Sequence, residues 1–196
     1  MTVILGIQID GAAILGCDSR TSEEGGRHLI TPNPKIINNN GILIAGSGAS
    51  RGSNILQFGY VVPKPKAGQN LDHYISRVFI PRMHKEFIAA GYNMKEDGDV
   101  AQQDSAFFVC VRGVIYPIWQ DYSWDTDESG VYYMGSGGDV ALGALDALGI
   151  EKVKTAEEAE VIVQKAIAIA INRDIYCAEP IHTFIQRAPV QRKKDL

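Results

Sequence analysis

Thr2 is the first residue of the chain whose type and position could do chemistry. It follows Met1 directly, and aminopeptidases remove an initiator methionine when the next residue is small. Loss of Met1 would leave a nucleophilic hydroxyl and a free amine on the same residue, which together form a complete nucleophile and base. A Met-Thr start is common, so the rest of the chain must decide between an N-terminal threonine nucleophile and chance.

Charged residues that could assist this nucleophile follow at fixed places along the chain: Asp18, Arg20, Lys35 and Asp174, with Ser136 in a Gly-Ser-Gly turn. A lysine beside Thr2 would make the site electropositive and lower the proton affinity of the amine. Asp18 would hold that lysine by a charge-assisted hydrogen bond. Each residue alone is more often a solvated surface group, so it is their joint order that favours a site.

The elements that must position these residues begin with two hairpins. Apolar residues at 2–9 and 12–17 flank Asp10-Gly11, a strong two-residue turn signal. Both arms are almost continuously apolar, which predicts burial on both faces. A second hairpin is expected at 35–37 and 42–45, around the turn residues 38–41. The segment 21–34 is expected to be a loop that holds a short strand near His28.

Helices and further strands alternate in the rest of the chain. Helices are expected over 48–59, 71–90, 138–148 and 155–172, the last with a capping box at Thr155 and Glu158. Pro81 is expected to kink the second helix. Strands are expected over 105–111, 114–119, 130–134 and 181–186, and a polar loop over 91–104. This order predicts an α+β fold, a four-layer αββα sandwich in which helix pairs flank two stacked antiparallel sheets.

Bulk properties are those of an ordinary globular protein. The chain has 196 residues, 45% hydrophobic and 21% charged, and fits one domain over 1–196. A net charge of −4 gives no support for nucleic-acid binding, and residues 190–196 are expected to form a basic, solvated tail. Three widely spaced cysteines suit a reducing cytosol. No signal peptide and no transmembrane helix are expected.

Two other groups of residues were considered as metal ligands. The acidic segment 121–129 holds Asp121, Asp125, Asp127 and Glu128, but their spacing does not match a calcium-binding EF-hand loop, so a solvated loop is favoured. The four histidines show no zinc-binding spacing. We therefore expect neither a metal nor an organic cofactor.

The whole pattern resembles the proteasome-fold N-terminal-nucleophile hydrolases, which include proteasome β-type subunits, the HslV peptidase and bacterial proteasome homologues. Members begin with Thr, an apolar strand, a Gly turn, a second apolar strand and Asp-Ser-Arg. Here these features are Thr2, the Asp10-Gly11 turn and Asp18-Ser19-Arg20, with the same separation of 16 positions from Thr to Asp. The Gly-Ser-Gly turn and Arg173-Asp174 match a second block of the family.

The resemblance implies a role for each matching residue. Thr2 would be the nucleophile, with Asp18, Lys35, Ser136 and Asp174 completing the catalytic group. The Gly46 N–H would be the oxyanion donor, and Arg20 and Cys177 would be supporting residues. The pocket for the residue before the scissile bond would be lined by Thr21, Asn33 and Ile44, with Ile44 favouring small or apolar side chains.

The chain also departs from the family pattern. Val3 stands where many members have a second Thr, and Lys35 lies one position further along than usual. Cys177-Ala178-Glu179 replaces a Ser-Gly-Gly turn, and a thiol is a weaker hydrogen-bonding partner for the amine than a hydroxyl.

The resemblance implies a cytoplasmic threonine endopeptidase built from stacked rings of six or seven identical subunits, which cleaves unfolded polypeptides inside a chamber. An ATP-dependent unfoldase is a possible partner, and the helices at 71–90 and 155–172 are candidates for packing between subunits. Two alternatives stay open: a non-proteolytic assembly subunit with the same fold, and an N-terminal-nucleophile amidase that acts on a small amide.

Overall fold

The computed structural model describes residues 2–22, 26–92 and 102–189. The basic tail and most of the expected 91–104 loop therefore lie outside the described residues. The first hairpin is confirmed: β1 (Ile4–Ile9) pairs antiparallel with β2 (Ala12–Cys17), and Ile4 lies opposite Cys17. Asp10 and Gly11 both have positive φ, at 50° and 64°, which is the left-handed turn that an Asp-Gly pair favours.

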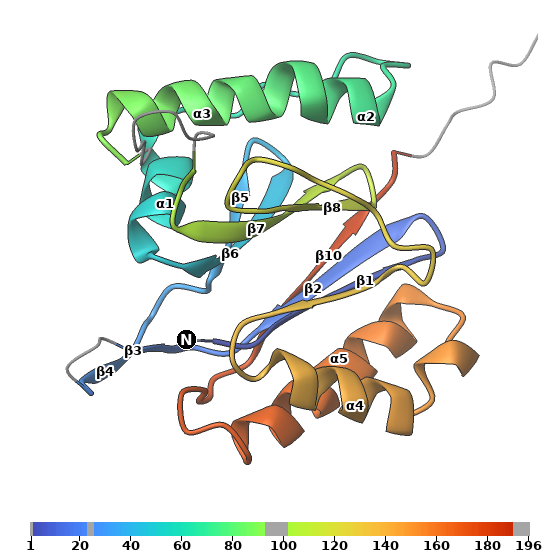
Figure 1. The fold of residues 1–196 in the computed structure, drawn as a ribbon. Coiled ribbons are helices and arrows are strands. Elements are labelled where there is room, and N and C mark those ends of the chain that lie inside the picture. The colour runs from blue at the N-terminus through green and yellow to red at the C-terminus, as the bar shows by residue number, and fades with distance from the viewer. Residues whose placement is uncertain (1, 23–25, 93–101, 190–196) are drawn as a thin grey trace, which may run out of the picture.

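Two four-stranded antiparallel sheets form the centre of the molecule (Figure 1). The first sheet has the order β10-β2-β1-β9, with β9 at Val131–Met134 and β10 at His182–Arg187. The second has the order β5-β6-β7-β8, with β5 at Ile36–Asn39, β6 at Ile42–Gly48, β7 at Ser105–Val111 and β8 at Val114–Ile118. The expected mixed α+β class with antiparallel sheets is confirmed.

The segment between the two sheets contains more structure than the sequence predicts. The expected short strand is β4 (His28–Ile30), and it pairs with β3 (Arg20–Ser22) in a separate two-stranded sheet. The turn of the second hairpin is tighter than predicted. Strand β5 runs through Asn39, so only Asn40 and Gly41 form the turn, with φ of 57° and 84°.

The expected helices are present, and two of them contain π-helical segments. Helix α1 (Ser50–Asn54) continues into η1 (Ile55–Gly59), and α2 (Leu71–Tyr74) continues through η2 (Ile75–Phe79) into α3 (Ile80–Ala89). Pro81 lies just after η2. It has no amide hydrogen for the carbonyl four residues earlier, so the irregularity is taken up as a wider π-helical turn.

The C-terminal helices are α4 (Gly138–Ala147) and α5 (Ala156–Ile171), joined through the short 3₁₀ helix η3 (Ile150–Lys152). The predicted capping box is confirmed. The Thr155 hydroxyl accepts from the Glu158 amide, and the Glu158 carboxylate accepts from the Thr155 amide, both at 3.2 Å.

Three apolar cores lie between these elements. One joins the first sheet to α4 and α5, one joins the two sheets, and one joins the second sheet to η1, α2, η2 and α3. Figure 1 shows α2 and α3 on the outer face of the second sheet and α4 and α5 on the outer face of the first. Alternate residues of β1 enter different cores: Leu5 packs toward the helices and Ile4 toward the other sheet. The near-continuous apolar pattern of the hairpin therefore reflects burial on both faces, as predicted.

Among the described residues, no helix is both long enough and apolar enough to cross a membrane.

Gly16 on β2 is the point of closest approach to α5. A Cβ there would lie 2.4 Å from Cγ1 of Val163 and 2.7 Å from Cδ1 of Ile167. We expect Gly16→Ala to lower the free energy of unfolding by about 1–3 kcal/mol, because the added methyl over-packs this core. Urea denaturation measures the change. The control is Gly143→Ala in α4, where a Cβ meets nothing within 4 Å; it should raise stability by about 0.5–1 kcal/mol. Equal stability of the two variants would contradict close packing at Gly16.

Candidate active site

The register of the first hairpin places Asp18 beside Thr2. Ile4 pairs with Cys17, so the next position along brings Val3 opposite Asp18. The Asp18 amide donates to the Val3 carbonyl at 3.3 Å, and the Val3 amide donates to Asp18 Oδ1 at 3.0 Å. The Thr2 hydroxyl donates to the same Oδ1 at 2.7 Å. The separation of 16 positions is thus a direct consequence of a tight hairpin.

Lys35 reaches the same point from the second sheet, since it immediately precedes β5. Its Nζ lies 2.6 Å from Asp18 Oδ1 and also donates to the Thr2 hydroxyl. The Asp18 side chain is fully buried and the Lys35 side chain is 12% exposed. The Thr2 oxygen therefore lies between a buried cation and a buried anion, and it is hydrogen-bonded to both.

The second carboxylate oxygen of Asp18 is held by backbone amides. Oδ2 accepts from Arg20 N at 2.9 Å and from Ala178 N at 3.1 Å. With the three bonds to Oδ1, the buried carboxylate accepts five hydrogen bonds. Full satisfaction of this kind is what allows a carboxylate to be buried as an anion.

The Gly-Ser-Gly turn at 135–137 closes over the backbone of Thr2. The Thr2 carbonyl accepts from Gly137 N at 3.1 Å and from the Ser136 hydroxyl at 3.5 Å. Gly135 has φ of 88°, and a Cβ at this position would lie 2.1 Å from the Thr2 carbonyl oxygen. Only glycine fits there, both for its backbone angle and for the contact.

Asp174 and Cys177 lie behind this turn, in the segment that follows α5. Asp174 Oδ1 accepts from the Tyr176 amide at 2.9 Å, and Oδ2 accepts from the Cys177 thiol at 3.4 Å. Burial raises the pKa of Asp174, but hydrogen bonds from Ser136, Tyr176 and Cys177 outweigh it, so the pKa lies below its usual value. Burial raises the pKa of Cys177 to about 12, so at neutral pH this residue is a thiol that donates to Asp174.

Arg20 connects the two segments that surround Asp18. Its amide binds the Asp18 carboxylate, and its guanidinium donates to the Ile175 carbonyl. This contact ties the turn after β2 to the segment after α5. Arg20 therefore supports the site by holding two backbone segments together. Among the described residues it forms no hydrogen bond with Thr2.

A pocket of about 480 Å³, which we call the threonine pocket, opens beside Thr2. Thr21, Asn33 and Lys35 line it, as does Gly46. Sequence reasoning missed Thr31 and two residues of the α1–η1 segment, Ser53 and Phe58. No local signal marks these residues. The packing of α1 against the end of β6 brings Ser53 and Phe58 to the pocket, and Thr31 reaches it from the segment between β4 and β5.

The expectation that Ile44 lines this pocket needs correction. The residue is 2% exposed and packs in the core between the second sheet and the helices η1, α2, η2 and α3. Gly46 lies on the pocket wall two residues further along the same strand face, where a Cβ would be 2.4 Å from Ser53 Oγ. The Gly46 N–H is not free either, since it donates to the Lys35 carbonyl over a long 3.4 Å.

Among the described residues, no group of three or more histidine, cysteine, aspartate or glutamate side chains is arranged to hold a metal ion. The arrangement around Thr2 is instead suited to activating a hydroxyl for attack on a carbonyl, because a cation and an anion both contact the oxygen.

Asp18→Asn removes the charge that compensates Lys35 while keeping the shape of the side chain. We expect the free energy of unfolding to fall by about 3–5 kcal/mol, the usual cost of breaking a buried ion pair on one side only. Chemical denaturation measures the loss. The matched control is Asp146→Asn on the exposed side of α4, which should change stability by less than about 0.5 kcal/mol. A stable Asp18→Asn protein would show that Asp18 and Lys35 do not depend on each other as charges.

Comparison with known proteins found matches only at the level of structure. Neither models of protein families nor curated protein sequences gave a match. BPH from Thiobacillus denitrificans superposes with a TM-score of 0.75 and 17% identity, over 96% of this chain and 100% of that one. BPH in complex with epoxomicin gives 0.74 and 18%, over 95% and 99%.

Eukaryotic HslV from Trypanosoma brucei gives a TM-score of 0.63 at 18% identity, over 94% of this chain and 99% of that one. At such identities the likeness lies in the fold, and it extends over nearly the whole length of each chain. The chain therefore has the fold of the proteasome-type N-terminal-nucleophile hydrolases.

Proposed function

We propose that this protein is a threonine-type endopeptidase, in which Thr2 becomes the N-terminal nucleophile after removal of Met1. The observation that carries the proposal is the Thr2 hydroxyl held between Lys35 Nζ and Asp18 Oδ1. The shared fold with BPH and HslV supports it, and the layered order of helices and sheets is taken as the αββα sandwich of that class.

In the proposed reaction, Thr2 Oγ attacks the carbonyl carbon of a peptide bond. Its proton passes to the Thr2 α-amine, directly or through water; an α-amine has a pKa of about 7.7–8.0 and is therefore partly neutral at cellular pH. The C–N bond then breaks as the proton moves to the leaving nitrogen. Water hydrolyses the resulting ester and regenerates the hydroxyl.

Lys35 and Asp18 have different electrostatic roles in this reaction. The Lys35 ammonium stabilises the negative charge that develops on Oγ and keeps the proton affinity of the nearby amine low. Asp18 fixes Lys35 in place and neutralises it in the ground state, so the cation can be buried beside Thr2. Ser136 and Asp174 support the backbone of Thr2 from the opposite side.

The oxyanion donor is proposed at the end of β6, where the backbone borders the threonine pocket at Gly46, Ser47 and Gly48. Gly46 serves if its long bond to the Lys35 carbonyl is exchanged for a bond to the substrate oxygen. Such an exchange costs little, because a 3.4 Å contact is a weak hydrogen bond.

The threonine pocket is proposed to take a neutral side chain. Ile44 is buried elsewhere, so the apolar surface of the pocket comes from Ile37 and Phe58. The polar surface of the pocket comes from Thr21 and Asn33. Lys35 is its charged lining residue, already paired with Asp18. A panel of fluorogenic peptides should therefore be cleaved fastest after small or apolar residues; fastest cleavage after arginine or glutamate would contradict this pocket assignment.

Rings of six or seven identical subunits remain the proposed assembly, located in the cytoplasm and fed with unfolded polypeptide, with an ATP-dependent unfoldase as a possible partner. Large apolar side chains support an assembly: Phe58, Val61 and Ile175 are each 73–75% exposed. Surfaces of this kind are usually covered by a partner. Light scattering tests the point, and a monomer at micromolar concentration would contradict it.

The central experiment is intact-mass analysis of the native protein, with and without an epoxyketone such as epoxomicin. The warhead needs both the hydroxyl and the free amine of an N-terminal threonine. We expect a mass without Met1 and one inhibitor adduct per subunit. Retained Met1 without an adduct would instead favour the non-proteolytic assembly subunit, and cleavage of small amides but not of peptides would favour an amidase.

Variants test the individual roles. Thr2→Ala should assemble normally but lose peptide cleavage by about 10⁴-fold or more, and Lys35→Ala should lose nearly as much, because residues that act as one unit are not additive. The matched control is Lys152→Ala, which removes a lysine whose side chain is 84% exposed and should leave cleavage unchanged. Full activity of Thr2→Ala would exclude Thr2 as the nucleophile.

A further inference from the structure

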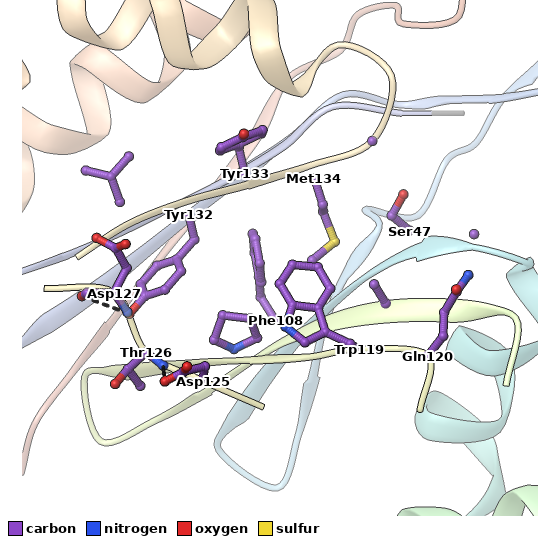
Figure 2. Close-up of a pocket in the computed structure, with 15 residues that line it drawn as sticks. Ser47, Phe108, Trp119, Gln120, Asp125, Thr126, Asp127, Tyr132, Tyr133 and Met134 are labelled. Atoms are coloured by element: carbon purple, nitrogen blue, oxygen red, sulfur yellow. Dashed lines mark hydrogen bonds between the residues drawn. The ribbon is translucent and has the colours of Figure 1, made fainter. Parts of the chain in front are cut away.

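A second and larger cavity adjoins the threonine pocket. Its volume is about 780 Å³, in the range of ligand-binding pockets in proteins. It lies between β9, the edge strand of the first sheet, and β7 and β8 of the second (Figure 2). The reaction described above makes no use of it.

Four aromatic residues, Phe108, Trp119, Tyr132 and Tyr133, line this space, and we call it the aromatic cavity. Tyr132 and Met134 project into it from β9, while Phe108 and Trp119 face them from the second sheet (Figure 2). Trp119 is 44% exposed, although tryptophan is usually well buried. An exposed indole on the wall of a cavity is a surface on which a ligand can stack.

The aromatic cavity and the threonine pocket meet at the end of β6. Ser47 and Gly48 line both spaces. Gly135 lines the aromatic cavity and packs directly against the Thr2 carbonyl. Consider a peptide with its scissile bond at Thr2 Oγ and the residue before that bond in the threonine pocket. The aromatic cavity is then the neighbouring space that can take the residues after the bond.

The mouth of the aromatic cavity is negatively charged. Asp125 and Asp127 line it, and none of its lining residues in the described part of the chain is basic. Hydrogen bonds from the Ser129 hydroxyl and amide lower the pKa of Asp127, so it is ionised at neutral pH. Neither aspartate forms an ion pair within the described residues.

We propose that the aromatic cavity binds the leaving segment of the substrate and selects an arginine or lysine side chain in it. The inference rests on the proposed function and extends it to substrate choice. A cationic side chain would stack on Trp119 and pair with Asp125 and Asp127, which together recognise arginine better than any neutral residue. When the C–N bond breaks, the leaving nitrogen takes the proton and the cationic segment departs from this cavity.

The test uses two internally quenched peptides with the same sequence before the scissile bond and either arginine or glutamine after it. Mass spectrometry of the fragments identifies the bond that is cleaved. We expect kcat/KM to be about tenfold higher for the arginine peptide, which corresponds to about 1.4 kcal/mol, and the ratio to fall as salt is raised.

The ratio of the two kcat/KM values is the readout for variants, because any change at the nucleophile affects both peptides and cancels. Asp125→Asn combined with Asp127→Asn should reduce the ratio to about twofold or less, and Trp119→Ala should reduce it in part. The matched control is Glu128→Gln, a neighbouring acid that does not line the aromatic cavity; it should keep the wild-type ratio.

The outcomes separate the two proposals. An epoxyketone adduct and peptide cleavage, with the same arginine preference in the double variant as in the wild type, would overturn this inference and leave the peptidase standing. The same would follow if Glu128→Gln lowered the ratio as much as the double variant. Absence of both adduct and cleavage would overturn the proposed function, and the present inference with it.

Discussion

The buried ion pair between Asp18 and Lys35 is the interaction on which the rest of the structure depends. Asp18 directly follows β2 of the first sheet and Lys35 directly precedes β5 of the second, so the pair links the two sheets. Burying either charge alone would cost several kcal/mol. The register of the first hairpin, the turn after β2 and the segment after α5 each supply groups that satisfy Asp18. Folding and the proposed chemistry therefore require the same contacts.

Backbone groups, more than side chains, hold the nucleophile in place. The Thr2 carbonyl is fixed by the turn at 135–137, and Asp18 is fixed by the amides of Val3, Arg20 and Ala178. Such a site tolerates side-chain change around it. This is the physical reason that Cys177 is accommodated: its thiol donates to Asp174 at 3.4 Å and does not contact the Thr2 hydroxyl.

The stacking of the sheets also decides where substrate can lie. Between the sheets, Ile4, Leu15 and Phe108 fill the centre. Toward β9 and β8 the space between the sheets is not filled, and the aromatic cavity remains there, with Gly135 between it and Thr2. On the other side, α1 closes the threonine pocket against the end of β6. The two spaces differ in character. The threonine pocket is the smaller one and is lined largely by polar residues, whereas the aromatic cavity is larger and is lined by aromatic and acidic residues.

Sequence alone determined the hairpins and the capped helix α5, because turn residues and caps are local properties of the chain. The resemblance gave Asp18, Lys35, Ser136 and Asp174 their expected roles, and the fold brings them near Thr2. Only the tertiary structure decided that Ile44 lies in the core, that the Gly46 amide is occupied and that β3 pairs with β4. It alone revealed the aromatic cavity, because a space between two sheet edges depends on how distant strands stack, and no local pattern records that distance.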